Sequence, residues 1–391
     1  MPVTDAELGS LRAKVEATHA DYMADLRRLV AIDCGTYSKA GVDEVGRIVG
    51  ERFRALGAAV ATVPNADLGD TVVATWTGAG GPSVLLIGHM DTVYPDGTVA
   101  RRPFTIDGNR AHAPGVTDMK AGLLTGLHAI AAVLAVAGDL PFKQLTFIAN
   151  PDEEIGSPAS RPVIQQHAGS ADVALVLECA RANGDIVSAR KGIVDLALRL
   201  TGRAAHAGIE PEKGRNAIVE AAHKMLAVTA LNGRWPGVTF NVGVIGGGTR
   251  PNVVPAEVTF EIDVRATTRA ALEAAEAEIA QICATSTVPD VTCSIEEKGR
   301  HWPMEKSAGT AQLVDYAVGL AGRLGFPLRD AATGGASDAN TTAGLGIPTV
   351  DGLGPVGGGD HSEEEYLELD SIVPRTTLLA GLLLTVARDP V

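Results

Sequence analysis

The sequence has little cysteine. Its four cysteines, Cys34, Cys179, Cys283 and Cys293, are scattered over 391 residues, and none of them forms a C-x-x-C pair. Small zinc-binding modules and disulfide-stapled domains both depend on closely spaced cysteines. The sequence therefore predicts neither, and we interpret the four residues as buried, reduced thiols.

Basic residues and long hydrophobic runs are also scarce. The chain has 33 Lys and Arg against 47 Asp and Glu, which gives a formal net charge of −14, and it has no basic patch. A nucleic-acid partner is therefore not expected. Residues 1–30 contain no apolar signal-peptide core, and the most apolar helical segments, residues 122–138 and 376–387, fall short of a membrane span. We expect a cytoplasmic protein without a membrane partner.

What the chain does contain is an alternation of apolar runs and helical patterns. Within residues 71–179, the runs TVVATW, SVLLIG, LTFIAN and VALVLE are typical of strands, and MKAGLLTGLHAIAAVLAVAG is typical of a long helix. Residues 347–387 resume this style with IPTVDGLG, a glycine-rich loop and a final helix. Continuous apolar strands between helices indicate an α/β domain with a mainly parallel, doubly covered central sheet.

The middle of the chain follows a different pattern. Alternating strands and two helices occur there in the order β-α-β-β-α-β, which is typical of a ferredoxin-like α+β domain. We therefore predict two domains, with residues 188–302 inserted into a domain formed by residues 1–187 and 303–391.

Acidic residues and histidines occur where the predicted strands end. His89, Glu154 and Glu178 each follow an apolar run, Asp118 opens a helix, and His361 lies in the last glycine-rich loop. Ligands of open α/β sheets bind beyond the carboxyl ends of the strands, so we expect these five side chains to converge. Clustered carboxylates repel one another unless a cation lies among them, and mixed histidine and carboxylate ligands suit zinc or a similar divalent ion.

Each of these residues also has a purely structural explanation. The H-x-D pair of His89 and Asp91 is compatible with an ordinary turn, the pair Glu153 and Glu154 with a solvated helix N-terminus, and Asp118 with a helix N-cap. Because all of them occur at or just after the ends of predicted strands, a shared metal-binding site is favoured over separate structural roles. An unpaired carboxylate at the end of a buried strand, as at Glu178, is also costly.

Several motifs, in their order along the chain, resemble those of a known family. The motifs GHMDTV, PGVTDMKAG, NPDEEIGS, VLECA and GGGDHS follow the order of the aminoacylase/glutamate carboxypeptidase family of dinuclear zinc peptidases. In the middle segment, GRAAHAGIEPEKGRNAI and GGGTRPNVVPAEVTFEIDVR resemble the family's lid domain. The likeness covers about residues 33–374 and is greatest to the bacterial glutamate carboxypeptidases. Ala113 and Asp360 depart from the commoner pattern, and neither departure removes a ligand.

The resemblance implies how the metals are held. Asp118 would bridge two zinc ions, or cobalt or manganese ions in their place. His89 and Glu178 would complete one metal site, and Glu154 and His361 would complete the other.

The resemblance also implies the remaining roles. Glu153 would be the general base for a metal-bridging hydroxide, and Asp91 would orient His89. His206, in the lid, would reach the scissile carbonyl in a partner subunit, since the family dimerises through this domain. Arg265 and Asn252 would hold the carboxylate and backbone of the substrate.

These roles imply a zinc-dependent exopeptidase. Its small-molecule substrate would be an N-acyl amino acid, a folate-like compound or a peptide, cleaved at the amide bond to a C-terminal amino acid, glutamate above all. An N-acyl-amino-acid deacylase with the same metal site is an alternative, and a non-catalytic binding protein that has kept the fold is another.

Overall fold

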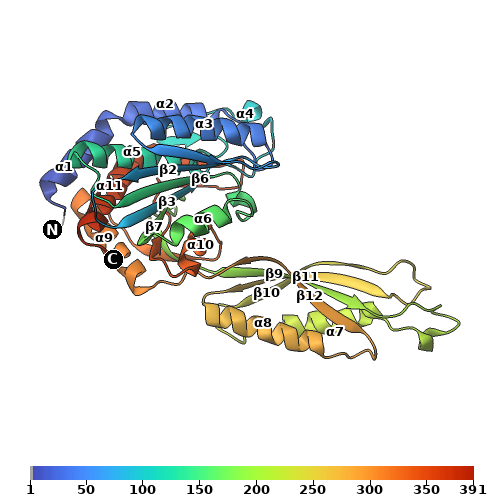
Figure 1. The fold of residues 1–391 in the computed structure, drawn as a ribbon. Helices are drawn as coiled ribbons and strands as arrows, with labels where there is room; N and C mark the ends of the chain where they lie inside the picture. The colour runs from blue at the N-terminus through green and yellow to red at the C-terminus, as the bar shows by residue number, and fades with distance from the viewer. Residues whose placement is uncertain (1–2) are drawn as a thin grey trace. The chain divides into compact units, whose positions relative to one another are not determined.

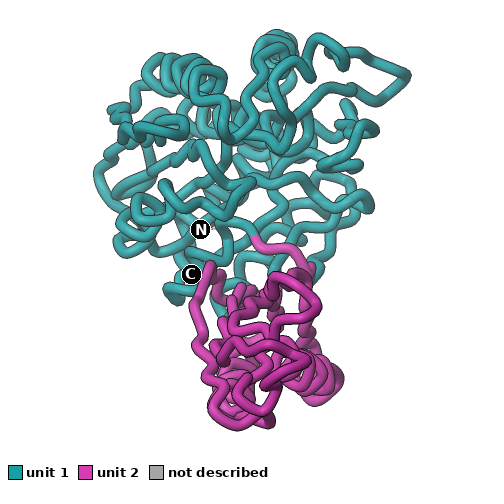
Figure 2. The backbone as a smooth tube through the Cα atoms, turned by 90° about the vertical axis from the view of Figure 1, so that its right-hand side faces the viewer, with its two compact units in different colours: residues 1–188, 306–332, 337–391 teal, residues 189–305, 333–336 magenta. Residues whose placement is uncertain are grey.

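The computed structural model describes residues 3–391, and its chain divides into two compact units (Figure 2). Unit 1 comprises residues 1–188, 306–332 and 337–391, and unit 2 comprises residues 189–305 and 333–336. The inserted unit therefore extends three residues beyond the predicted end at residue 302. It also takes in residues 333–336, which the sequence pattern assigns to the other domain. This short segment joins unit 2 because its carbonyl groups accept hydrogen bonds from Lys191, Arg190 and Arg265.

The core of unit 1 is a six-stranded sheet in the order β1-β2-β6-β3-β7-β14. The strands are β1 Ala59–Val63, β2 Thr71–Thr77, β3 Ser83–His89, β6 Gln144–Asn150, β7 Val173–Val176 and β14 Thr349–Val350. Strands β6, β3, β7 and β14 run parallel, and β1 and β2 are antiparallel additions at one edge. The predicted, mainly parallel sheet is thus confirmed. Apolar and polar residues do not alternate along its central strands, because both faces of the sheet are covered. Every residue of β3 is buried.

Helices cover both faces of this sheet, with α3 and α5 on one side and α6 and α10 on the other (Figure 1). The helices of unit 1 are α1 Asp5–Ala17, α2 His19–Val30, α3 Lys39–Ala55, α4 Thr98–Arg101, α5 Ala121–Ala137, α6 Arg161–Ala168, α9 Ala308–Leu324, α10 Asp338–Gly344 and α11 Ile372–Arg388. Two stretches, Val116–Ala137 and Leu369–Arg388, are long and apolar enough to cross a membrane, contrary to the estimate from the sequence. Both are mostly buried within the protein, as core helices are.

Two small sheets complete unit 1. One has the order β15-β16-β5-β4, formed by β4 Thr105–Asp107, β5 Arg110–His112, β15 Gly357–Gly358 and β16 Tyr366–Glu368. The other pairs β8 Ile186–Arg190 with β13 Asp330–Thr333, two strands whose last residues already belong to unit 2. Because β16 pairs with β5, the segment that leads to Asp118 and the loop that carries His361 are held to each other.

Unit 2 is a four-stranded antiparallel sheet in the order β10-β11-β9-β12, with two helices packed against it (Figure 1). Its elements are β9 Gly192–Thr201, α7 Ala217–Thr229, β10 Thr239–Gly247, β11 Glu257–Ala266, α8 Arg269–Ala284 and β12 Thr292–His301. Alternate residues of β9 and β11 enter the core against the helices, which explains their period of two. The predicted ferredoxin-like insert is confirmed.

Candidate active site

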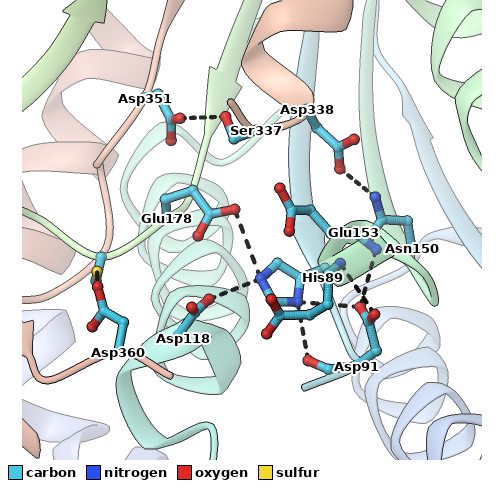
Figure 3. Close-up of polar contacts among 12 residues, drawn as sticks. His89, Asp91, Asp118, Asn150, Glu153, Glu178, Ser337, Asp338, Asp351 and Asp360 are labelled. Carbon is cyan, nitrogen blue, oxygen red and sulfur yellow. Dashed lines mark hydrogen bonds and ion pairs between the residues drawn. The ribbon is translucent and has the colours of Figure 1, made fainter. Parts of the chain in front are cut away.

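Strand β3 carries His89 to the end of the sheet, where its side chain is only 1% exposed. Nε2 of His89 lies 2.9 Å from Oδ1 of Asp118 and 3.7 Å from Oε1 of Glu178. Figure 3 shows these two carboxylates on one side of the imidazole ring and Asp91 on the other. Three of the predicted ligands, from β3, from the turn before α5 and from the end of β7, therefore meet at one point.

Asp118 stands between two histidines. It lies in the turn Val116–Lys120, where its backbone leaves the helical region (φ −112°, ψ 94°) before α5 begins. Its Oδ1 faces His89, and its Oδ2 lies 3.1 Å from Nε2 of His361. One carboxylate that presents each of its oxygens to a different histidine has the geometry of a bridge between two cations.

Glu154 and Glu153 follow β6 in the short helix Glu153–Ile155 and turn to different parts of the cluster. Oε2 of Glu154 lies 3.0 Å from Nε2 of His361. Glu153 has an oxygen within 4.8 Å of ligand atoms of both His89 and Glu178. The structure thus brings all five predicted ligands together, with Glu153 beside them.

The donor atoms fit divalent metal ions. His89, Glu153 and Glu178 form one group, and His89, Asp118 and Glu154 form another, with donor atoms within 4.8 Å of one another in each group. Ligand atoms that share a zinc ion at about 2.0–2.2 Å lie up to about 4 Å apart, so small side-chain movements satisfy this geometry.

The carboxylates strongly perturb one another. Burial raises the pKa of Glu178 to about 7, and burial together with the charge of Glu178 raises the pKa of Glu153 well above its ordinary value. Hydrogen bonds to Asp118 and Glu154 raise the pKa of His361 to about 11. Neighbouring carboxylates contribute to each of these shifts, and a cluster of this kind attracts cations.

Asp91 has a broader role than the predicted one. The nearest group to Nδ1 of His89 is the backbone carbonyl of Asp91, at 3.0 Å, and its Oδ1 is 3.3 Å away. The Asp91 carboxylate also accepts hydrogen bonds from the backbone N–H groups of Glu153 and Glu154, at 3.2 and 3.3 Å, and from the hydroxyl of Thr36, at 2.6 Å. Asp91 therefore orients His89 and also positions the loop that carries the other acidic residues.

Two buried acids of the site escape sequence reasoning. Glu365 is fully buried and accepts hydrogen bonds from the backbone N–H groups of Gly115, Thr117 and Asp118, at 2.9, 2.9 and 3.1 Å. It thereby connects the loop after His361 to the turn that carries Asp118. Within the run SEEEY nothing singles it out, because its neighbours Glu363 and Glu364 are exposed.

Asp338, the first residue of α10, is the second missed acid. Its carboxylate accepts a hydrogen bond from the amide of Asn150 (Figure 3). It accepts another from the hydroxyl of Ser157, at 2.6 Å. Burial raises its pKa to about 6, and its charge contributes to the raised pKa of Glu153. The signal in the sequence, an Asp in the first turn of a helix, is too common to suggest such a role.

The three predicted lid residues lie in unit 2, at opposite ends of its sheet. His206 and Asn252 are on adjoining segments, since Ala207 N–H donates to the carbonyl of Asn252 at 3.0 Å. That region adjoins the Glu257 end of β11, whereas Arg265 lies eight residues further along this strand. At about 3.4 Å per residue, roughly 27 Å separates the two ends. The structure therefore does not bring Arg265 to the other two residues.

Residues 85–385 match the family described as Peptidase family M20/M25/M40. The chain belongs to this family. It is 33% identical to carboxypeptidase G2 of Pseudomonas sp. (strain RS-16) over 367 residues, covering 92% of this chain and 88% of that protein. It is 31% identical to acetylornithine deacetylase of Myxococcus xanthus over 202 residues, covering 48% of this chain and 51% of that protein. Aminopeptidase PepT of Bacillus cereus has the same fold, with a TM-score of 0.77, 24% identity, and coverage of 94% of this chain and 99% of that one.

Family membership confirms the resemblance seen in the motifs. The protein is an enzyme that acts on peptide or amide bonds, as a metallopeptidase or amidohydrolase. Members of this peptidase family are dinuclear metal enzymes, and the residues of unit 1 form candidate metal-binding groups. The two hydrolase alternatives are therefore favoured over a non-catalytic binding protein.

Proposed function

We propose that this protein is a zinc-dependent carboxypeptidase that removes a C-terminal amino acid, preferably glutamate, from N-acyl or folate-like substrates. The observation that carries the proposal is the position of Asp118, whose two oxygens face His89 and His361 at 2.9 and 3.1 Å. A second acid, Glu153, lies beside this pair with a raised pKa. A bridging carboxylate with a free acid next to it suits two-metal hydrolysis of an amide.

In this proposal His89 and Glu178 would hold one ion, His361 and Glu154 would hold the other, and Asp118 would contribute to both sites. Bound cations of this kind make a water acidic at neutral pH and polarise a carbonyl group. Glu153 lies beside the proposed ligands and would accept the proton of the attacking water and deliver it to the leaving amine. Asp91 and Glu365 keep the ligand loops in place through the backbone hydrogen bonds described above.

The residues of unit 2 have side chains suited to substrate binding. The backbone N–H of Gly208 donates to Nδ1 of His206 at 3.1 Å, which places the ring proton on Nε2 when the imidazole is neutral. The Nε2–H is then able to donate to a carbonyl oxygen. The guanidinium of Arg265 contacts Asp263 at 3.0 Å and the carbonyl of Gly334 at 3.0 Å. Each terminal nitrogen of Arg265 still has a second hydrogen for a substrate carboxylate.

A homodimer formed through unit 2 accompanies this proposal. One small substrate cannot contact both ends of the unit 2 sheet in a single chain, so a second copy supplies His206. The edge strand β10 and helix α7 carry exposed apolar side chains, Val244 (56%), Ile245 (52%) and Leu226 (71%), that suit such an interface. An expected cytoplasmic location also belongs to this proposal.

A deacylase remains the second candidate, because the similarity to acetylornithine deacetylase covers 48% of the chain. The likeness to carboxypeptidase G2 covers 92% of the chain and so includes unit 2, where the proposed substrate-binding residues lie. For this reason we favour the carboxypeptidase.

The test is metal analysis of the purified protein together with a substrate panel. We expect about two zinc ions per chain and hydrolysis of N-acyl-L-glutamates in preference to N-acetylornithine. Glu153→Gln should lower kcat by roughly 10²–10⁴-fold with the metal content unchanged. Glu273→Gln, an exposed position on α8, is the control. Full activity in Glu153→Gln would overturn the mechanism, and preferred hydrolysis of N-acetylornithine would favour the deacylase.

A further inference from the structure

A cavity of about 460 Å³ opens beside Glu154 within unit 1. Two loops, residues 35–38 and 92–96, form its walls, and Glu154 and Ile155 form its inner end. The cavity thus begins at a residue of the metal-ligand cluster and extends away from it. Its volume falls within the range of small-molecule sites, about 300–1,000 Å³.

The walls of this cavity are held by hydrogen bonds to each other and to the catalytic residues. Thr36 N–H donates to the carbonyl of Thr92 at 3.1 Å, and the Thr36 hydroxyl donates to Asp91 at 2.6 Å. The hydroxyl of Tyr94 donates to the carbonyl of Ser362, next to His361, at 2.7 Å. The cavity is therefore pre-formed, and its position relative to the ligands is fixed.

The side chains that line it are aromatic, apolar, hydroxyl-bearing or acidic. Tyr37 is 79% exposed, Val93 is 41% exposed and Ile155 is 38% exposed, so large apolar surfaces face solvent without a partner. None of the described residues that line the cavity is a lysine or an arginine, whereas Asp96 and Glu154 are acidic. The described lining therefore offers no cationic side chain to a free carboxylate of a substrate, whereas an uncharged apolar group would be bound.

From these observations we infer that this cavity is the subsite for the acyl group, on the carbonyl side of the scissile amide. It selects bulky aromatic or branched apolar acyl groups. The inference rests on the proposed function, in which the amino acid that leaves carries the free carboxylate. An acetyl group would leave most of the cavity filled with water and would gain little from Tyr37, Val93 and Ile155. The enzyme should therefore discriminate among substrates by the acyl group as well as by the amino acid.

The experiment compares N-acetyl-, N-isovaleryl- and N-benzoyl-L-glutamate with the zinc-loaded full-length protein. We expect kcat/KM to rise in this order, by at least roughly 10-fold between acetyl and benzoyl, since even one methylene in an apolar pocket changes kcat/KM by about 10–200-fold. Val93→Trp fills the cavity and should reverse the preference. Val63→Trp, at a valine of similar exposure (40%) on β1, is the matched control and should not change it.

A second variant and a binding measurement separate the subsite from catalysis. Tyr37→Ala removes one wall and, at so exposed a position, should not affect folding; we expect the benzoyl to acetyl ratio to fall several-fold. Calorimetric titration of the Glu153→Gln protein with N-benzoyl-L-glutamate should show binding that Val93→Trp weakens and Val63→Trp does not.

The outcomes for the subsite and for the proposed function are distinct. Equal kcat/KM for the acetyl and benzoyl substrates, with the same ratio in Val93→Trp and Val63→Trp, would overturn the subsite. The proposed carboxypeptidase activity would not be affected by that result. Absence of hydrolysis of every N-acyl-glutamate overturns the proposed function. In that case the titration decides the subsite, because equal binding by the two tryptophan variants overturns it and selective loss in Val93→Trp supports it.

Discussion

In unit 2, the fully buried carboxylate of Glu220 lies 3.1 Å from Nζ of the equally buried Lys224. Both groups have further partners. Lys224 donates to three carbonyl groups at the end of α8, among them that of Ile282 at 2.6 Å, and Glu220 accepts from two backbone N–H groups, at 2.9 and 2.6 Å. In unit 1, the described ion pairs of Asp118, Glu154 and Glu178 involve only His89 and His361.

The two regions bury charge for different ends. In unit 2, the charges of Glu220 and Lys224 neutralise each other, and their hydrogen bonds connect α7 to the end of α8. This pair therefore stabilises the fold without any ligand. The cluster in unit 1 holds four carboxylates, counting Glu153, against two imidazoles. Its excess negative charge is not neutralised until cations bind. Stability in one place and ligand binding in the other are thus separable properties, and single substitutions should affect one and leave the other intact.

The largest effect is expected from Asp118→Asn. An amide cannot bridge two cations as a carboxylate does, so both ions should be lost or weakened together. We expect the metal content to fall from about two ions to less than one, and hydrolysis to fall by at least roughly 10³-fold. Elemental analysis and steady-state kinetics measure the two quantities.

Asp107→Asn, at an exposed position of β4, is the control for the loss of one negative charge near this region. Two ions retained by Asp118→Asn would show that the position does not bridge, and the assignment of both metal sites would then fail.

Lys224→Met should give the largest change in stability. The substitution leaves the buried Glu220 carboxylate without its cation, which costs about 3–5 kcal/mol, whereas the double variant with Glu220→Gln should recover much of that loss. Urea unfolding followed by tryptophan fluorescence measures the difference, with Trp235 and Trp302 in unit 2 and Trp76 in unit 1. Metal content should not change.

Lys298→Met is the control, because the side chains of Lys298 and Glu296 are 45% and 67% exposed, and an exposed ion pair contributes little to stability. Loss of metal from Lys224→Met, or a cost no greater than that of the control, would contradict the separation of the two regions.

Lys224 also shows where sequence reasoning stops. The pattern AIVEAAHKM predicts a helix correctly, but a Glu and a Lys four residues apart are typical of an exposed helical pair. Their burial depends on the carbonyl groups at the end of α8, far away in the sequence, which no local pattern reveals. Glu365 and Asp338 in unit 1 escape notice for the same reason.

What local patterns do reveal is the order of strands and helices and the residues at strand ends. His89 and Glu178 could be found because an apolar strand ends in each of them, and parallel strands present their carboxyl ends at one edge. Asp118 and His361 lie on irregular loops, so the sequence placed them only near this edge, and the role of Asp118 as a bridge came from the family resemblance. The cavity beside Glu154 lies between two loops whose pairing has no signal in the sequence.

Glu178→Gln should have a moderate effect on the free energy of unfolding. The effect should be stabilising in metal-free protein and destabilising in zinc-loaded protein. Burial raises the pKa of Glu178 to about 7, so the folded state binds this proton more tightly than the unfolded state. The resulting stabilisation is complete below about pH 4.3, the ordinary pKa of Glu, and is lost as pH rises through about 7. In chelator-treated protein at about pH 8, Glu178→Gln should therefore be more stable than the wild type, by on the order of 1–3 kcal/mol.

With zinc present the order should reverse, because the variant lacks a ligand and gains less from binding the metal. Thermal unfolding at about pH 5 and pH 8, with chelator and with zinc, gives the four comparisons, with Glu273→Gln as the control. A variant less stable than the wild type in all four would show that Glu178 is an ordinary structural acid.

The smallest effect is expected from Glu7→Gln, in a charge pair that is neither buried nor near the metal site. Glu7 of α1 accepts hydrogen bonds from Arg388 of α11 at 2.6 and 3.0 Å, which lower the pKa of Glu7 to about 2. The stabilisation is therefore present above the ordinary pKa of Glu and is lost as pH falls through about 2.

The side chains of Glu7 and Arg388 are both about 30% exposed, so screening limits the cost of Glu7→Gln to about 1 kcal/mol or less. Chemical unfolding at low and at high salt measures it. The cost should shrink in 1 M salt and be the same with and without zinc, whereas a dependence on zinc would mean that the metal cluster influences charge pairs throughout unit 1 and not only its own ligands.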